Sequence, residues 1–224
     1  MRIILASASP RRKELLGHIF SDFEIIPAQR EENAIFKNPS QYVSDLAFSK
    51  AYEVAETSFG LKSQTDSGHG SINVNGPGTA LIIGADTIVY AGEKVLGKPS
   101  DTESAIEMLQ LLSGKRHSVY TGVALLLLEK QDVQTVCLRN LTFSEKTHVF
   151  VSDLTKQEIS AYIDTGDCFD KAGSYGIQGQ FSKHIDHIEG DYFNVVGLPV
   201  SRLYREIKAH LSFLLDSSKR PHAL

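Results

Sequence analysis

Two long strand patterns, one directly after the other, limit the folds open to this chain of 224 residues. Residues 118–129 and 134–151 carry the apolar and β-branched side chains that are typical of strands. We expect them to pair as antiparallel neighbours. Residues 80–85 form a third, buried strand pattern, and helical patterns occur before and after these segments. The sequence therefore predicts a mixed α/β (α+β) protein with one extended central sheet.

Capping residues set the expected starts of the helices. Ser9, followed by Pro10, opens a first helix, and Asn38 with Pro39 opens a second. A last apolar-periodic helix runs from about residue 199 to residue 215. Two further helices begin at capping boxes, which pair Ser100 with Glu103 and Thr155 with Glu158.

Residues 57–79 interrupt these patterns, because they are rich in Ser, Gly, Asn, Asp and Pro and have few large apolar side chains. We expect a flexible surface insertion there and not a linker between domains. Residues 216–224 form a tail that we expect to fray. The sequence thus predicts a single domain over residues 1–215.

Composition and charge exclude several classes of protein. The formal net charge of −4 disfavours a nucleic-acid backbone as the main partner. Cys137 and Cys168 form neither a zinc-binding spacing nor a disulfide framework, which fits a reducing compartment. The N-terminal apolar run is too short for a signal peptide, and no apolar run is long enough to cross a bilayer. We therefore expect a cytoplasmic globular protein without a nucleic-acid or membrane partner.

The segment 5–12 places small hydroxyl residues and two adjacent arginines where an apolar strand passes into the first helix. The helix N-terminus, the hydroxyls of Ser7 and Ser9, and the guanidinium groups of Arg11 and Arg12 would converge on one point. Such a point attracts phosphate or carboxylate. The alternative is a capped helix with two solvated arginines, and this segment alone favours neither interpretation.

Three further charged residues are candidates for a site. Asp86 follows the buried strand, where α/β proteins often carry a functional carboxylate, although a cap or turn aspartate is equally consistent. Lys98 lies in a tight turn where it could bind a phosphate, but the turn alone favours a solvated lysine. Lys50 lies one turn after Leu46 on the buried side of its helix, and this spacing slightly favours a side chain that reaches outward to solvent.

Other motifs give weaker signals. Residues 170–179 contain three glycines, so a ligand could approach their backbone closely. The pair Glu31 and Glu32 is interpreted most simply as solvated. The eight histidines form no metal-binding pair on a predicted helix, which disfavours a histidine-based metal site.

Taken together and in order, six segments closely resemble the Maf family of nucleoside triphosphate pyrophosphatases. The resemblance extends from Ile3 to about Leu203, and only residues 57–79 and the C-terminal tail depart visibly from it. It implies an inosine-triphosphatase-like fold, in which helices flank an extended mixed sheet and form two lobes with a cleft. The six segments are Ser7–Arg12, Glu31–Glu32, Gly84–Thr87, Gly97–Pro99, Ser118–Val123 and Asp170–Gly179.

The resemblance also implies roles for individual residues. Asp86 matches the carboxylate treated as the catalytic base, and Glu32 and Lys98 match further charged residues of the catalytic site. The family branch that prefers dTTP and UTP has an arginine, a threonine and a glutamine at three positions, which are here Arg11, Thr87 and Gln178. Other residues that match polar substrate-binding groups are Ser7, Ser9, Arg12, Lys50 and Lys171.

The implied activity is hydrolysis of dTTP and UTP to the monophosphate and pyrophosphate, by attack of water at the α-phosphorus. Glu32 and Asp86 would hold a divalent cation, Mg²⁺ or Mn²⁺, because both ions prefer carboxylate and water ligands. The family likeness further suggests a homodimer. Two alternatives stay open: a nucleotide-sensing regulator linked to cell division with little turnover, and a pyrophosphatase of the same fold for a modified purine triphosphate.

Overall fold

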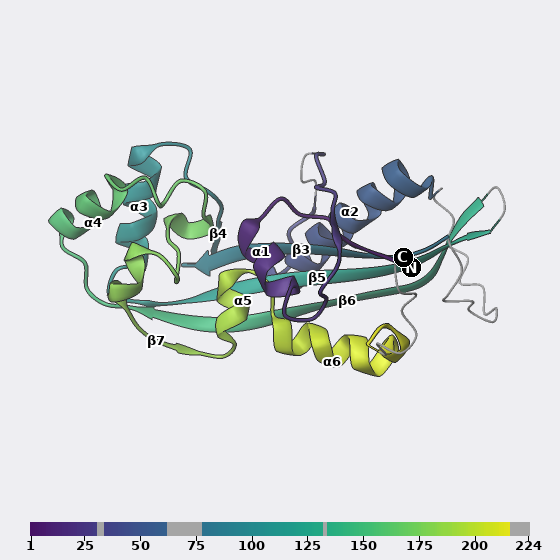
Figure 1. Cartoon of the computed structure of the whole chain (residues 1–224). Helices are drawn as coiled ribbons and strands as arrows, with labels where there is room; N and C mark the ends of the chain where they lie inside the picture. The colour runs from purple at the N-terminus through teal and green to yellow at the C-terminus, as the bar shows by residue number, and fades with distance from the viewer. Residues whose placement is uncertain (31–33, 62–77, 132–133, 216–224) are drawn as a thin grey trace.

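The computed structural model describes residues 1–30, 34–61, 78–131 and 134–215 (Figure 1). The strands are β1 (Arg2–Leu5), β2 (Glu24–Ile25), β3 (Thr79–Ala91), β4 (Lys94–Leu96), β5 (Arg116–Gln131), β6 (Gln134–Val151) and β7 (Ile185–Glu189). The α-helices are α1 (Pro10–Leu16), α2 (Pro39–Phe59), α3 (Thr102–Leu112), α4 (Lys156–Ile163), α5 (Tyr192–Val196) and α6 (Val200–His210). Short 3₁₀ helices are η1 (Ala172–Ser174), η2 (Gln180–His184) and η3 (Ser212–Leu214).

The described strands form one mixed sheet in the order β2-β1-β3-β5-β6-β7, with β4 paired to β3. Strand β1 runs parallel to β2 and β3, and the remaining pairs are antiparallel. The predicted antiparallel pairing of the two long strands is therefore confirmed. These strands, β5 and β6, run along most of the length of the molecule (Figure 1).

Strand β3 is longer than expected, and this moves Asp86 from the end of a strand to its middle. The strand expected at 80–85 continues through Asp86 as one element that ends at Ala91. On one edge, β1 pairs with β3 only as far as Ile83, and β4 begins to pair at Val89. Residues 84–88 thus lie in a gap where no described strand pairs with this edge.

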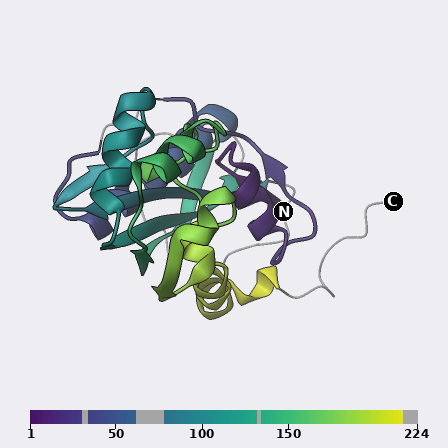
Figure 2. The same ribbon diagram turned by 90° about the vertical axis from the view of Figure 1, so that its left-hand side faces the viewer.

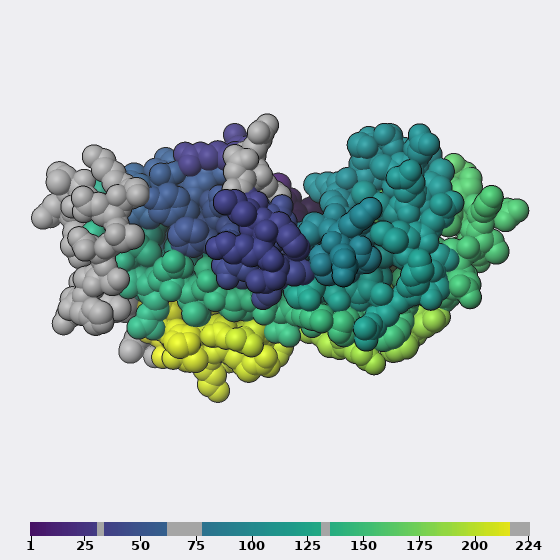
Figure 3. Space-filling model, turned by 180° about the vertical axis from the view of Figure 1, so that it is seen from behind, coloured from purple at the N-terminus to yellow at the C-terminus, as the bar shows by residue number. Residues whose placement is uncertain are grey.

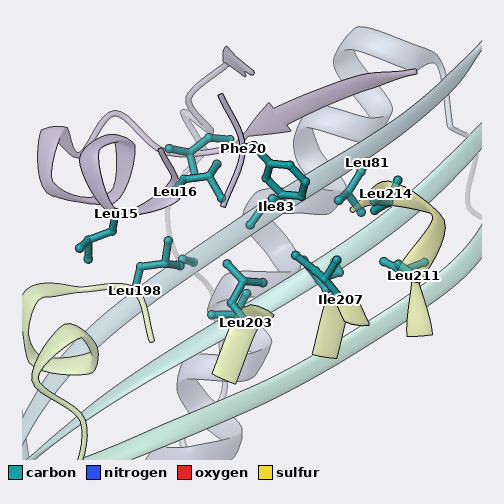
Figure 4. Close-up of a cluster of buried hydrophobic side chains, with 14 of the residues drawn as sticks. Leu15, Leu16, Phe20, Leu81, Ile83, Leu198, Leu203, Ile207, Leu211 and Leu214 are labelled. Atoms are coloured by element: carbon teal, nitrogen blue, oxygen red, sulfur yellow. The ribbon is translucent and has the colours of Figure 1, made fainter. Parts of the chain in front are cut away.

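Helix α2 covers one face of the sheet, and α1 and α6 cover the opposite face (Figure 1). The alternation of β3 side chains explains both layers: Ile82 packs toward α2, whereas Leu81 and Ile83 pack toward α1 and α6. Figure 4 shows Leu81 and Ile83 on the sheet facing Phe20 and the residues of α6.

A second cluster of buried side chains lies under α3 and α4, at the other end of the long strands. The clusters of buried side chains define two lobes, one with α1, α2 and α6 and one with α3 and α4. Figure 2 looks onto the second lobe, with α3 and α4 in front of the sheet. From behind, the space-filling view shows the surface hollowed between the two lobes (Figure 3). The mixed α/β fold with an extended sheet and two lobes agrees with the prediction.

Two glycines allow α2 to approach the sheet more closely than side chains would permit. A Cβ atom at Gly84 of β3 would lie 2.1 Å from the backbone oxygen of Ala47, and one at Gly122 of β5 would lie 2.1 Å from that of Val43. Both distances are far below van der Waals contact, so α2 rests directly on the strand backbones. This close packing brings the α2 side chains to the level of Asp86.

Several predicted boundaries need correction. The expected insertion at 57–79 is shorter at both ends, because Thr57 lies in the last turn of α2 and Thr79 is buried in β3. Its residues 62–77, like the tail 216–224, lie outside the described residues. Helix α3 is capped by Asp101 with Ser104, one residue later than the expected capping box, and the last helix ends at His210 before η3. The caps at Ser9, Asn38 and Thr155 are as predicted.

Within the described residues, no helix combines the length and the apolar character that a membrane crossing requires.

Candidate functional site

A cleft of about 680 Å³ opens at the gap in the edge of β3 and extends between the two lobes. Its wall combines charged side chains, apolar side chains and residues of the glycine-rich segment 170–179. Of the predicted site residues, those that line it are Ser9, Arg11, Arg12, Lys50, Asp86, Thr87, Lys98, Lys171 and Gln178. The structure therefore brings together side chains from α1, α2, β3, the loop after β4 and the segment around η1.

Asp86 and Lys50 form an ion pair between β3 and α2. The Asp86 side chain is 11% exposed and that of Lys50 is 21% exposed, so both are largely withdrawn from water yet face the cleft. The prediction that Lys50 reaches outward to solvent is wrong. It points into the polar site instead, because the close packing of α2 on Gly84 places it over Asp86.

Arg12 is held by acceptors from three separate parts of the chain. Its Nη1 donates to Ser7 Oγ at 3.1 Å, its Nη2 to Thr87 Oγ1 at 3.1 Å, and its Nε to the backbone oxygen of Gly197 at 3.0 Å. Ser9 caps α1 by accepting from the Arg12 backbone nitrogen. The guanidinium group is thus fixed in orientation where α1, β3 and the end of α5 meet.

Arg11 points in another direction, toward the glycine-rich segment. Its Nη1 lies 3.5 Å from Asp170 Oδ2, while Lys171 Nζ donates to Asp170 Oδ1 at 2.6 Å and to Asp167 Oδ1 at 2.8 Å. Partial burial by itself raises the pKa of the Asp170 carboxyl, but the hydrogen bond and charge of Lys171 and the charge of Arg11 outweigh it and lower this pKa. The two arginines therefore point to different parts of the cleft wall, whereas one of the two interpretations of segment 5–12 had them converge on one point.

The remaining predicted residues differ in exposure. Lys98 and Gln178 are exposed at the rim, and a hydrogen bond from the Gly173 nitrogen to the Gly97 oxygen (2.9 Å) ties their two loops together. Ser7 is buried behind Arg12 and does not line the cleft. Glu32 lies outside the described residues.

Sequence reasoning missed the buried polar groups behind the cleft. Thr121 and Asn194 are completely buried, and the Thr121 hydroxyl donates to the Asn194 backbone oxygen at 2.8 Å. The Asn194 side chain in turn donates to Val119 O at 3.1 Å and to Thr147 Oγ1 at 3.0 Å. The available signal was a threonine within each of the apolar patterns of β5 and β6, because a buried hydroxyl requires a partner.

The donor chemistry of the cleft fits a divalent cation only in part. Among the described residues, no group of three or more His, Cys, Asp or Glu side chains could hold a metal ion. Mg²⁺ is, however, usually bound through one or two carboxylates together with substrate phosphates. The Asp86 carboxylate, which faces the cleft, suits an ion shared with a substrate but not a site made by the protein alone.

Comparison with known proteins agrees with this architecture. The chain is 49% identical over 208 residues to the dTTP/UTP pyrophosphatase of Agathobacter rectalis, a match that covers 92% of this chain and 96% of the relative. It is 45% identical to the protein of the same name from a Thermoanaerobacter species, covering 93% and 96%, and 48% identical to that from Bacillus cereus, covering 92% and 94%. The model of the family described as Maf-like protein matches residues 2–210, and the chain therefore belongs to this family.

Proposed function

We propose that this protein hydrolyses dTTP and UTP to the nucleoside monophosphate and pyrophosphate. The observation that carries the proposal is the cleft, where the Asp86 carboxylate pairs with Lys50 and where Lys98 and Arg12 also line the wall. Proteins named dTTP/UTP pyrophosphatase are similar over more than nine-tenths of both chains, which supports the same reaction here.

In this proposal Asp86 is the general base. It accepts a proton from the water that attacks the α-phosphorus, and the bond from that phosphorus to the bridging oxygen of the leaving pyrophosphate breaks. Lys50 keeps the carboxylate in place, since the two form an ion pair where both are largely withdrawn from water. The negative charge that builds up on the phosphate oxygens requires nearby cations. Lys98 is suited to this role because it is exposed at the rim of the cleft.

A divalent cation completes the proposal, and Asp86 with Glu32 would hold it. When bound, such an ion would neutralise phosphate charge and raise the acidity of water in the cleft. The protein's own contribution is the placement of the Asp86 carboxylate, and Glu32 has the same ligand chemistry.

Selection of the nucleobase would depend on residues at the exposed rim of the cleft. The carboxamide of Gln178 offers both a donor and an acceptor, so it could pair with the O4 and N3–H groups that uracil and thymine share. Thr87 lies deeper in the same cleft, beside Arg12.

The test is pyrophosphate release by the purified protein from a panel of triphosphates: dTTP, UTP, CTP, GTP and a modified purine triphosphate. Each is assayed with Mg²⁺, with Mn²⁺ and with EDTA. We expect release from dTTP and UTP, and its loss in EDTA. Tight binding of a nucleotide without release would favour a sensor, and preference for the modified purine would assign another substrate.

A further inference from the structure

We infer that Thr121, a buried residue outside the cleft, positions Thr87 and Arg12 for substrate binding by fixing the direction of a hydrogen-bond chain. This inference rests on the proposed function. Thr121 is 0% exposed and does not line the cleft, whereas Thr87 and Arg12 do. The three residues come from β5, β3 and α1.

The number of protons that each group can donate fixes the direction of this hydrogen-bond chain. The Thr121 hydroxyl has one proton and gives it to the Asn194 backbone oxygen at 2.8 Å, because a carbonyl can only accept. Thr121 Oγ1 is also 2.9 Å from Thr87 Oγ1, so Thr87 must donate in that contact. Arg12 has only donors, and its Nη2 lies 3.1 Å from Thr87 Oγ1, so Thr87 accepts there. Protons therefore point from Arg12 to Thr87, then to Thr121 and finally to the Asn194 carbonyl.

Asn194, the last residue of this hydrogen-bond chain, is rigidly held. Asn194 is completely buried, and its side-chain nitrogen donates to Val119 O on β5 and to Thr147 Oγ1 on β6. The oxygen that receives the last proton is thus fixed to the two longest strands. Gly197, three residues further on, accepts from Arg12 Nε. One segment around α5 therefore orients Arg12 twice, directly through Gly197 and indirectly through Thr121.

The consequence for the cleft is chemical. With its proton committed to Thr121 and one lone pair committed to Arg12, the Thr87 hydroxyl presents its second lone pair. At this point the cleft takes a hydrogen-bond donor of the nucleotide. Because Gln178 pairs with the N3–H group of uracil and thymine, this donor is an O–H of the sugar. The cleft disfavours a group that can only accept, since two facing acceptors would stay unpaired.

Thr121→Val tests the inference because it removes the hydroxyl and keeps the shape. We expect KM for UTP to rise about tenfold, because Thr87 and Arg12 lose their fixed orientation. The change in kcat should stay below about threefold, because Asp86 and Thr87 are successive strand residues that point to opposite faces of β3. Thr121→Ser, which keeps the hydroxyl, should restore KM. An unchanged KM in Thr121→Val, with wild-type turnover intact, overturns this inference and leaves the proposed function standing.

A double-mutant cycle separates positioning from general support. If Thr121 acts through Thr87, Thr121→Val should add less than about twofold to KM in a Thr87→Val background. Full additivity would overturn the inference.

Thr135→Val is the matched control, because this buried β6 threonine also donates to a backbone oxygen, that of Phe59. It should leave KM unchanged, and a rise like that of Thr121→Val would overturn the inference. Wild-type protein that releases no pyrophosphate from UTP would overturn the proposed function and this inference together.

A substrate analogue tests the expected donor. 3′-Deoxy-UTP lacks the 3′ O–H, which is the sugar hydroxyl that UTP and dTTP share. We expect it to have a higher KM than UTP with the wild type and the same KM as UTP with Thr87→Val. Equal KM values for UTP and 3′-deoxy-UTP in the wild type would overturn the assignment of Thr87 as an acceptor.

Discussion

The ion pair of Asp86 and Lys50 shows how single residues acquire their chemistry from packing. Nothing in the charge pattern of α2 marks Lys50 as a site residue, and its spacing suggested a solvated side chain. It reaches Asp86 because glycine at positions 84 and 122 lets α2 rest directly on β3 and β5. The carboxylate then faces a cation in a setting where water screens their charges poorly, so their attraction holds the carboxylate in place.

Asp86→Asn tests the proposed base. An amide cannot accept the proton of the attacking water, so we expect a loss of at least about a hundredfold in kcat. Far-UV circular dichroism and the unfolding midpoint should show that the variant still folds. Asp22→Asn, at an exposed aspartate, is the control and should retain full activity. Retained activity in Asp86→Asn would move the base elsewhere, with Glu32 the next candidate.

Gln178→Glu tests recognition of the pyrimidine. A carboxylate cannot donate, so its pairing with the O4 group of uracil is lost. We expect kcat/KM for UTP to fall by about tenfold or more relative to CTP and GTP, with the same unfolding midpoint because Gln178 is exposed. Relative rates on the three triphosphates that do not change would contradict this role.

At the scale of elements, the contact of α2 with the sheet determines the geometry of the site. Strand β3 carries Asp86 toward α2 and Thr87 toward α1, so the helices on the two faces supply different partners. The gap between β1 and β4 exposes the edge of β3 at this point, and the cleft reaches both side chains.

Gly122→Ala should disturb this contact. The new methyl group would lie 2.1 Å from the Val43 backbone oxygen and 2.7 Å from the Ser44 nitrogen, so α2 must move. We expect the free energy of unfolding to fall by about 2 kcal/mol or more, measured by urea denaturation, because overpacking against backbone is poorly relieved. Gly97→Ala is the control for stability, because a Cβ atom there meets nothing within 4 Å. Equal stabilities of the two variants would contradict the close approach of α2.

For the molecule as a whole, the residue patterns of the sequence predicted the sheet better than they predicted the site. The long strands and most caps follow from side-chain periodicity and local hydrogen bonding, which act over a few residues. The continuity of β3 through Gly84 and Asp86 does not follow from local patterns, because both residues are poor strand formers. Here they are extended because β3 pairs with β5 along this stretch. The support of Thr121 by Asn194, 73 residues later, depends on packing that no local pattern records. Asp86 and Lys98 stood out as site residues mainly through family resemblance.

The lobe that contains α3 and α4 has a buried histidine whose ionisation should make the stability of the molecule depend on pH. His117 is 3% exposed, and its Nε2 lies 2.6 Å from the hydroxyl of Tyr175, which lines the cleft. Burial, helped by the charge of His148, lowers the pKa of His117 to about 4. Its Nδ1 has no hydrogen-bond partner within the described part of the chain, so the protonated ring would be poorly accommodated.

The direction of the effect follows from proton binding. The His117 pKa is about 4 in the folded state and near its ordinary 6.5 in the unfolded state, so between these values the unfolded state binds more protons. Stability is therefore lost as the pH falls through this window. Between pH 7 and pH 5 we expect the wild type to lose about 2 kcal/mol more than His117→Gln, which has no titrating ring and can still bond to Tyr175. Urea denaturation of both proteins at pH 7, 6 and 5 measures this difference, and parallel pH profiles would show that His117 is not responsible.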